Sequence, residues 1–224
     1  MAKWFQTLTL TIALVFSSQV SATVPTEAAK FIEGLGTQAI ALLSQPGQPS
    51  ENSENQVRSL LSENFDLDRI GQFVVGRYWE TMSSDQQKAY LDVFREFVLR
   101  SYSRRFGGYA GSKFAVVGSQ PGGRDDVIVL TQIIRPDDPN VDAGWRVTTE
   151  DGQLKIVDVI ISGVSMAMTQ RSDFTTAIRR EGVDTFIGRL RAQLAGLQQP
   201  GDKPRSALDA PTYPITKLNG LALR

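Results

Sequence analysis

The sequence predicts an α+β fold in which an antiparallel sheet of four to five strands packs against several helices. Two observations lead to this prediction. Apolar residues recur with helical spacing in both the first and the last part of the chain. Between these parts, residues 113–161 form short runs rich in Val, Ile and Thr, separated by turn residues. Helices and strands that are segregated along the chain are typical of α+β domains.

The longest predicted helix spans residues 84–106. Ser84 with Gln87 three positions later has the pattern of a capping box, and Gly107-Gly108 is a natural stop. One side of this helix is apolar and rich in rings, with Tyr90, Leu91, Phe94, Phe97, Val98 and Tyr102. Such a face is either ordinary core or, in part, the wall of a cavity for an apolar ligand.

Three shorter helices are expected before it, at 26–43, 51–62 and 65–76. Asp66 is the expected N-cap of the third. After the sheet, helical spacing returns from Val164 to Ile178 and again after Gly182. The sequence therefore predicts helices on both sides of the strands in chain order.

Four strands are expected at 113–118, 126–134, 143–149 and 153–161. The segments 120–123, 136–140 and 150–152 separate them, and Asp151-Gly152 in the last is the strongest hairpin signal in the chain. Short connections of this kind join antiparallel neighbours, so we expect a meander.

Residues 1–22 have the pattern of a secretory signal peptide. Lys3 precedes an apolar core at 8–16, and Val20-Ser21-Ala22 offers small residues for cleavage after Ala22. A retained membrane helix is the alternative, but the apolar run is short for a bilayer. We expect a soluble, exported domain at 23–197 and a disordered tail at 198–224, where a linker-like composition begins.

Composition excludes several classes of function. Lys and Arg (24) balance Asp and Glu (24), which argues against a nucleic-acid partner. The sequence contains no Cys and no His, which removes thiolate catalysis, the Ser-His-Asp triad and the usual zinc ligands. Paired carboxylates sit at caps and turns, and Ser165 lacks the second glycine of a nucleophile elbow. We therefore expect a binding protein without cofactor or metal.

Two stretches of the chain resemble a known family. The first runs from Phe65 through Gly76-Arg77-Tyr78-Trp79 to Tyr109. The second contains Trp145-Arg146-Val147, then residues 154–165 ending in Gly-Val-Ser, then Arg171-x-x-Phe174 and Gly182-x-Asp184. Together they are similar to the periplasmic phospholipid-carrier family of Gram-negative bacteria, the MlaC type, also called toluene-tolerance proteins. Gln170, where many members carry tyrosine, leaves a hopanoid-associated branch open, and the tail lies outside the family pattern.

The resemblance implies a curved sheet with helices against it, and lipid tails held between the two layers. It also implies a monomeric shuttle in the periplasm. Its partners would be a phospholipid or related lipid, an inner-membrane ABC transporter complex and an outer-membrane lipoprotein complex. The expected lipid-binding residues are Phe73, Leu91, Phe94, Val98, Tyr102, Val129, Trp145, Val147, Val159, Ile161, Val164, Met168, Phe174, Ile178 and Phe186.

Other functions stay open at this point. An exported protein-interaction module with a solid core has the same sequence pattern, and a hydrolase that uses carboxylates or Ser165 is a third hypothesis. Arg171, Arg179 and Arg180 either meet a phosphate or a partner protein, or belong to a solvated helix face.

Overall fold

The computed structural model describes residues 26–43, 51–103, 111–136 and 139–197. Within them the elements are α1 (Thr26–Leu43), α2 (Glu51–Asn64), α3 (Leu67–Val75), the 3-10 helix η1 (Gly76–Thr81), α4 (Ser84–Ser103), β1 (Lys113–Gly123), β2 (Asp126–Ile134), β3 (Val141–Glu150), β4 (Gln153–Ile161), β5 (Val164–Ser165), α5 (Met166–Glu181) and α6 (Val183–Gly196). The predicted α+β class is confirmed. The expected signal peptide and tail lie outside the described residues.

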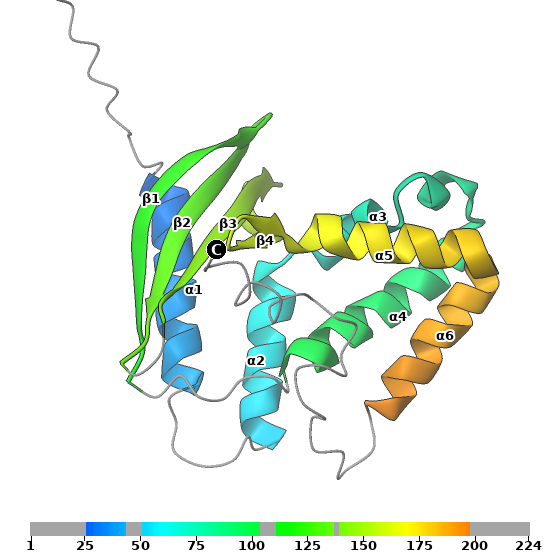
Figure 1. Cartoon of the computed structure of the whole chain (residues 1–224), viewed down its shortest axis with the longest axis horizontal. Coiled ribbons are helices and arrows are strands. Elements are labelled where there is room, and N and C mark those ends of the chain that lie inside the picture. Colours follow the sequence, from blue (N-terminus) through cyan, green and yellow to red (C-terminus); the bar gives the residue numbers. More distant parts are fainter. Residues whose placement is uncertain (1–25, 44–50, 104–110, 137–138, 198–224) are drawn as a thin grey trace, which may run out of the picture.

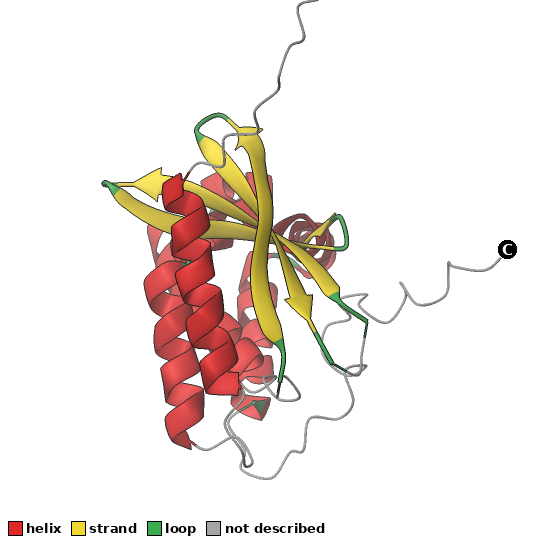
Figure 2. Ribbon diagram, turned by 90° about the vertical axis from the view of Figure 1, so that its left-hand side faces the viewer, coloured by secondary structure: helices red, strands yellow, loops and turns green. Residues whose placement is uncertain are grey.

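The sheet is an antiparallel meander in the order β1-β2-β3-β4-β5. Helix α1 packs against β1 and β2, whereas α3 to α6 pack mainly on one another beyond β4 (Figure 1). The view turned by 90° from Figure 1 shows α1 and α2 side by side on one face of the sheet (Figure 2). The protein therefore has a sheet part and a helical part.

The strands mostly follow the expected bounds, but β1 does not. It runs to Gly123 through Pro121, which we expected in a turn, and the turn lies instead at Arg124-Asp125. Pro121 is tolerated because β1 is an edge strand and needs no donor on its outer side. Two register shifts, at Val116/Gly118 and Pro121/Gly123, bend the strand.

The β3–β4 hairpin is built as predicted. Asp151 and Gly152 both have positive φ, 47° and 76°, which is the combination that a type I′ turn requires. This turn fixes a register in which Glu150 pairs with Gln153.

Local capping positions the helices. Asp66 Oδ1 accepts a hydrogen bond from Arg69 N at 2.9 Å, so the predicted cap of α3 is confirmed. The capping box of α4 was predicted one residue too late. It joins Ser83 and Gln86, whose side chains each accept from the other's backbone N–H.

Buried apolar residues form two separate cores. The helical core is built by residues of α3 to α6, including Val74, Tyr90 and Leu190. The sheet core is built by α1 and the face of the sheet beneath it, with Ile32 and Ile156 fully buried. Residues after α2 connect the parts, because Asp66 N donates to Ile156 O at 3.0 Å and Phe65 bridges to Ile156.

Candidate functional site

Six of the fifteen expected lipid-binding residues lie in the helical core or on its border. Aromatic rings dominate here, with centroids of Phe174 and Phe186 4.8 Å apart and those of Tyr90 and Phe94 5.6 Å apart. The Tyr90 hydroxyl donates to Gly71 O at 3.0 Å, and burial raises the pKa of Tyr90. The six are Phe94, Phe174, Ile178 and Phe186, which are buried, and Leu91 and Val98, which are partly buried.

Four others belong to the sheet core. Val129 and Val147 are buried, and Trp145 and Val159 border them. The Trp145 ring stacks edge-on to Phe114 with centroids 6.4 Å apart, and its Nε1 donates to Thr131 Oγ1 at 2.8 Å. This hydrogen bond satisfies the indole N–H inside an apolar setting.

The remaining five lie outside both cores. Tyr102, Ile161 and Val164 are partly buried, whereas Phe73 is 39% exposed and Met168 is 57% exposed. The structure therefore does not bring the fifteen residues together in one lining. Helical and strand periodicity show which side of an element is apolar, but not which of two cores it joins.

Two surface depressions flank α2, and sequence reasoning did not find them. The larger, of about 540 Å³, lies between α1 and α2 and is lined by both polar and apolar side chains, with Gln38, Asn55 and Glu63 beside Leu42 and Leu60. The smaller, of about 260 Å³, is lined by Ser62, Phe65, Asp66, Leu67, Asp68, Arg95, Leu99, Glu150 and Lys155. None of the fifteen expected residues lines either depression.

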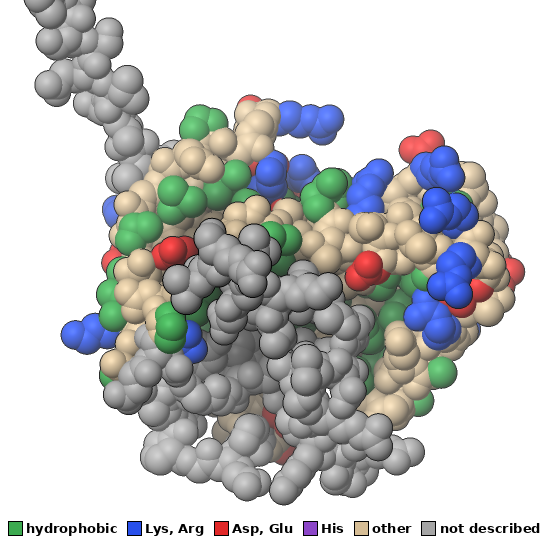
Figure 3. All heavy atoms as spheres, in the orientation of Figure 1, with side chains coloured by type: hydrophobic (Ala, Val, Ile, Leu, Met, Phe, Trp, Pro, Cys, Tyr) green, Lys and Arg blue, Asp and Glu red, His purple; other side chains and the backbone are tan. Residues whose placement is uncertain are grey.

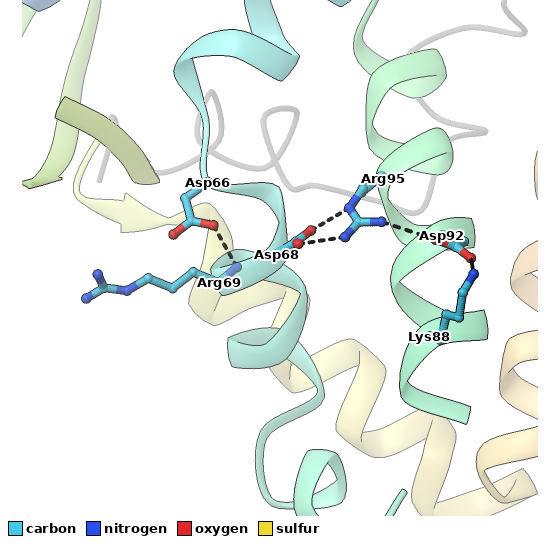
Figure 4. Close-up of polar contacts among 6 residues, drawn as sticks. All are labelled: Asp66, Asp68, Arg69, Lys88, Asp92 and Arg95. Carbon is cyan, nitrogen blue, oxygen red and sulfur yellow. Dashed lines mark hydrogen bonds and ion pairs between the residues drawn. The ribbon is translucent and has the colours of Figure 1, made fainter. Parts of the chain in front are cut away.

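Charges in the smaller depression join elements from both parts. Arg95 of α4 and Asp68 of α3 face each other as a two-point ion pair, and Arg95 also meets Asp92 at 3.1 Å (Figure 4). A hydrogen bond with Asp66 raises the pKa of Glu150. These charged side chains form a polar contact between α3, α4 and the β3–β4 hairpin.

The Gly-Val-Ser stretch makes the junction from β4 to α5. Ser162 and Gly163 take positive φ to turn the chain. Ser165 is the N-cap of α5, because its Oγ accepts from Met168 N at 3.0 Å and donates to Asp158 at 2.6 Å. Asp158 also accepts from Ala167 N at 2.9 Å. Ser165, considered above as a nucleophile, thus has a capping role.

Arg171 holds α3 and α5 together. Its guanidinium donates to Phe73 O at 2.8 Å and lies 4.8 Å from the centre of the Phe73 ring. Gly76, which has φ of 57°, leaves the room for it, since a Cβ there would lie 2.9 Å from an Arg171 nitrogen. The two motif segments quoted above, Gly76-Arg77 and Arg171-x-x-Phe174, therefore meet in space.

Comparison with known proteins identifies the family. The model of the MlaC protein family matches residues 35–192, which include all of the sheet and most of the helices. The chain belongs to the MlaC family. The resemblance of the two motif segments to MlaC-type proteins is thereby confirmed.

Individual MlaC relatives agree with this assignment. The intermembrane phospholipid transport system binding protein MlaC of Haemophilus influenzae is 24% identical over 196 residues, which cover 84% of this chain and 92% of the relative. A solved structure of the phospholipid-binding protein from Ralstonia solanacearum, in complex with a phospholipid, matches with a TM-score of 0.66 at 21% identity. The match covers 77% of this chain and 99% of that one. This second likeness shows the fold.

Proposed function

We propose that this protein is a periplasmic phospholipid-binding shuttle of an intermembrane lipid transport system, without catalytic activity. The observation that carries the proposal is the MlaC family match across most of the described chain. The names of the two relatives support it, since one is a binding protein of such a system and the other was solved with a phospholipid. The signal-peptide pattern of residues 1–22 supports export.

Physical chemistry defines what such a shuttle must do. Exposing one acyl chain of ~16 carbons to water costs on the order of 12 kcal/mol, at ~0.8 kcal/mol per CH₂. The protein must therefore cover the tails with apolar side chains, while the polar head can stay in water. No reactive group is needed for this.

We place the tails between the two cores. Residues such as Phe94 and Val147 are each 2% exposed and already fill their own cores. Partly buried apolar residues on the margins still have surface to offer a hydrocarbon chain. These are Leu91, Val98, Tyr102, Trp145, Val159, Ile161 and Val164.

Entry of the tails then requires the sheet part and the helical part to separate. Each part keeps its own buried core during this movement, and the lipid tails cover the apolar margins that the movement opens. We propose that the inner-membrane ABC transporter complex and an outer-membrane lipoprotein complex are the donors and acceptors of the lipid.

Native mass spectrometry of the protein purified from its own host tests the proposal. We expect a bound mass of several hundred daltons that organic solvent extracts, and identification of the extract distinguishes a glycerophospholipid from a hopanoid. A bare polypeptide under gentle conditions would instead favour the exported interaction module with a solid core.

A further inference from the structure

The exposed face of α5 combines basic and apolar side chains. Met168, Ser172, Thr175 and Arg179 recur at spacings of four, three and four residues, so they form one stripe along the helix. Arg171 lies one turn after Met168 and covers the Phe73 ring of α3. Phe73 and Met168 are the two exposed large apolar side chains of the described helices.

Arginines continue this face toward η1 and α6. Figure 3 shows basic side chains gathered along α5 and at its corner with α6. Arg179 and Arg180 are exposed, and Arg77 lies 5.3 Å from the centre of the Tyr78 ring. Within the described part of the chain no carboxylate is paired with any of these three.

The net charge of the face is positive in a protein whose total charge is zero. Arg77, Arg171, Arg179 and Arg180 contribute four positive charges, and Glu80 and Asp173 remove two, which leaves 4 − 2 = +2. Arg189 adds nothing, because it pairs with Glu181 at 2.8 Å. The charge therefore complements an anionic partner.

The composition of the face favours a bilayer surface. Neither of the two depressions described above is lined by a residue of α5, and the exposed large apolar side chains of the described helices are Met168 on α5 and Phe73 on α3. A bilayer surface accepts such side chains, since they enter the headgroup region while arginines stay among the phosphates. An acidic protein segment would bind the arginines but gives no reason for the exposed Met168.

We propose that the α5 face, formed by Phe73, Arg77, Met168, Arg171, Arg179 and Arg180, docks the protein on the surface of an anionic phospholipid bilayer. This role goes beyond carrying a lipid, because it concerns the outside of the protein and a membrane rather than one molecule. Binding through so few charges is weak and reversible, which suits a protein that must leave the membrane again.

Vesicle flotation tests the proposal. The full mature protein is mixed with phosphatidylcholine vesicles that contain or lack phosphatidylglycerol, at low and at physiological salt. We expect binding to the anionic vesicles, and a steep loss as salt shortens the screening length from about 30 Å to about 8 Å. The Arg77→Glu/Arg179→Glu variant should bind at least about tenfold more weakly, because each charge near such a surface contributes about 1 kcal/mol.

A matched control distinguishes the contribution of the α5 face to vesicle binding from that of the total charge of the protein. Lys30 of α1 and Lys113 of β1 are exposed, and Lys30→Glu/Lys113→Glu makes the same change in total charge. This control should bind like the wild type. Met168→Ser should weaken binding although it leaves the net charge of the protein unchanged. Equal loss in both double variants, or wild-type binding that ignores phosphatidylglycerol, would overturn the proposal.

The test is independent of the carrier function. Lipid extracted from purified Arg77→Glu/Arg179→Glu should match the wild type in amount. If the wild type carries lipid but does not float with anionic vesicles, only the docking proposal fails. Should the double variant prove unstable to heat, Arg179→Gln/Arg180→Gln tests the same face with a smaller change.

Discussion

At the scale of single residues, two glycines of α1 have opposite environments. A Cβ added to Gly36 would lie 2.3 Å from the Phe114 ring, which packs there against the helix from β1. A Cβ added to Gly34 would meet nothing within 4 Å. Gly36 is therefore needed for the contact between α1 and the sheet, whereas Gly34 only weakens the helix.

We predict that Gly36→Ala and Gly34→Ala change stability in opposite directions. Gly36→Ala should lower the free energy of unfolding by about 1–3 kcal/mol because the core is overpacked. Gly34→Ala should raise it by about 0.5–1 kcal/mol because alanine favours the helix. Urea unfolding measures both, and two increases would mean that the Phe114 ring does not lie against α1.

Local sequence signals predicted the helix caps and the hairpin turn well, but one capping box was placed one residue too late. Asp66 and the Asp151-Gly152 turn were found because each acts through backbone atoms a few residues away. The capping box of α4 was misplaced because Ser83 and Ser84 are each followed by glutamine three residues later. Only the folded backbone shows that Ser83 is the N-cap.

At the scale of elements, ion pairs tie neighbouring helices together. Both carboxylate oxygens of Glu96 on α4 accept from Arg58 of α2 at 3.0 Å, and one also accepts from Arg100 at 3.1 Å. Burial alone would raise the pKa of Glu96, but the hydrogen bonds from the two arginines outweigh it and the pKa is lowered.

This lowered pKa predicts an acid-sensitive contact between α2 and α4. Stability from Glu96 is fully present above its unfolded pKa of 4.5 and is lost as pH falls through the lower folded value. Glu96→Gln should therefore flatten the fall of unfolding free energy on the acid side. Arg58→Gln should have a similar effect. A Glu96→Gln/Arg58→Gln variant whose unfolding free energy falls more steeply with decreasing pH than that of either single variant would contradict the prediction.

The elements themselves were largely predictable, because periodicity is a local property. The expected bounds of α1, β2 and β4 agree with the structure. The course of β1 through Pro121 was missed, since proline is excluded from inner strands and the sequence does not say which strand lies at an edge.

At the scale of the whole molecule, two cores share one chain. The family resemblance implied a sheet with helices against it and a lipid lining drawn from both layers. The structure instead gives each part its own interior, so buried residues such as Phe186 and Val129 are core in this conformation. This division depends on long-range packing and could not be predicted from spacing.

The two-core arrangement predicts which substitutions separate lipid binding from folding. Val98→Asp, on the border of the helical core, should lower the lipid retained after purification several-fold while the protein stays folded. Phe94→Asp should instead unfold the protein, because it places a charge in a filled core. Native mass spectrometry and circular dichroism measure the two effects.

Val117 provides the control for this prediction. It is 63% exposed on β1, so Val117→Asp should change neither lipid retention nor folding. Full lipid retention by Val98→Asp would mean that the tails do not pass along this part of α4.

The two borders of the sheet bear on behaviour at high concentration. On the β1 side, a proline and two register shifts interrupt the row of backbone groups that another strand would need. On the β4 side, Phe65 and β5 already occupy part of that row. Edge-to-edge association of copies into fibrils is thus discouraged at both edges of the sheet. This helps the protein to avoid aggregation at high concentration.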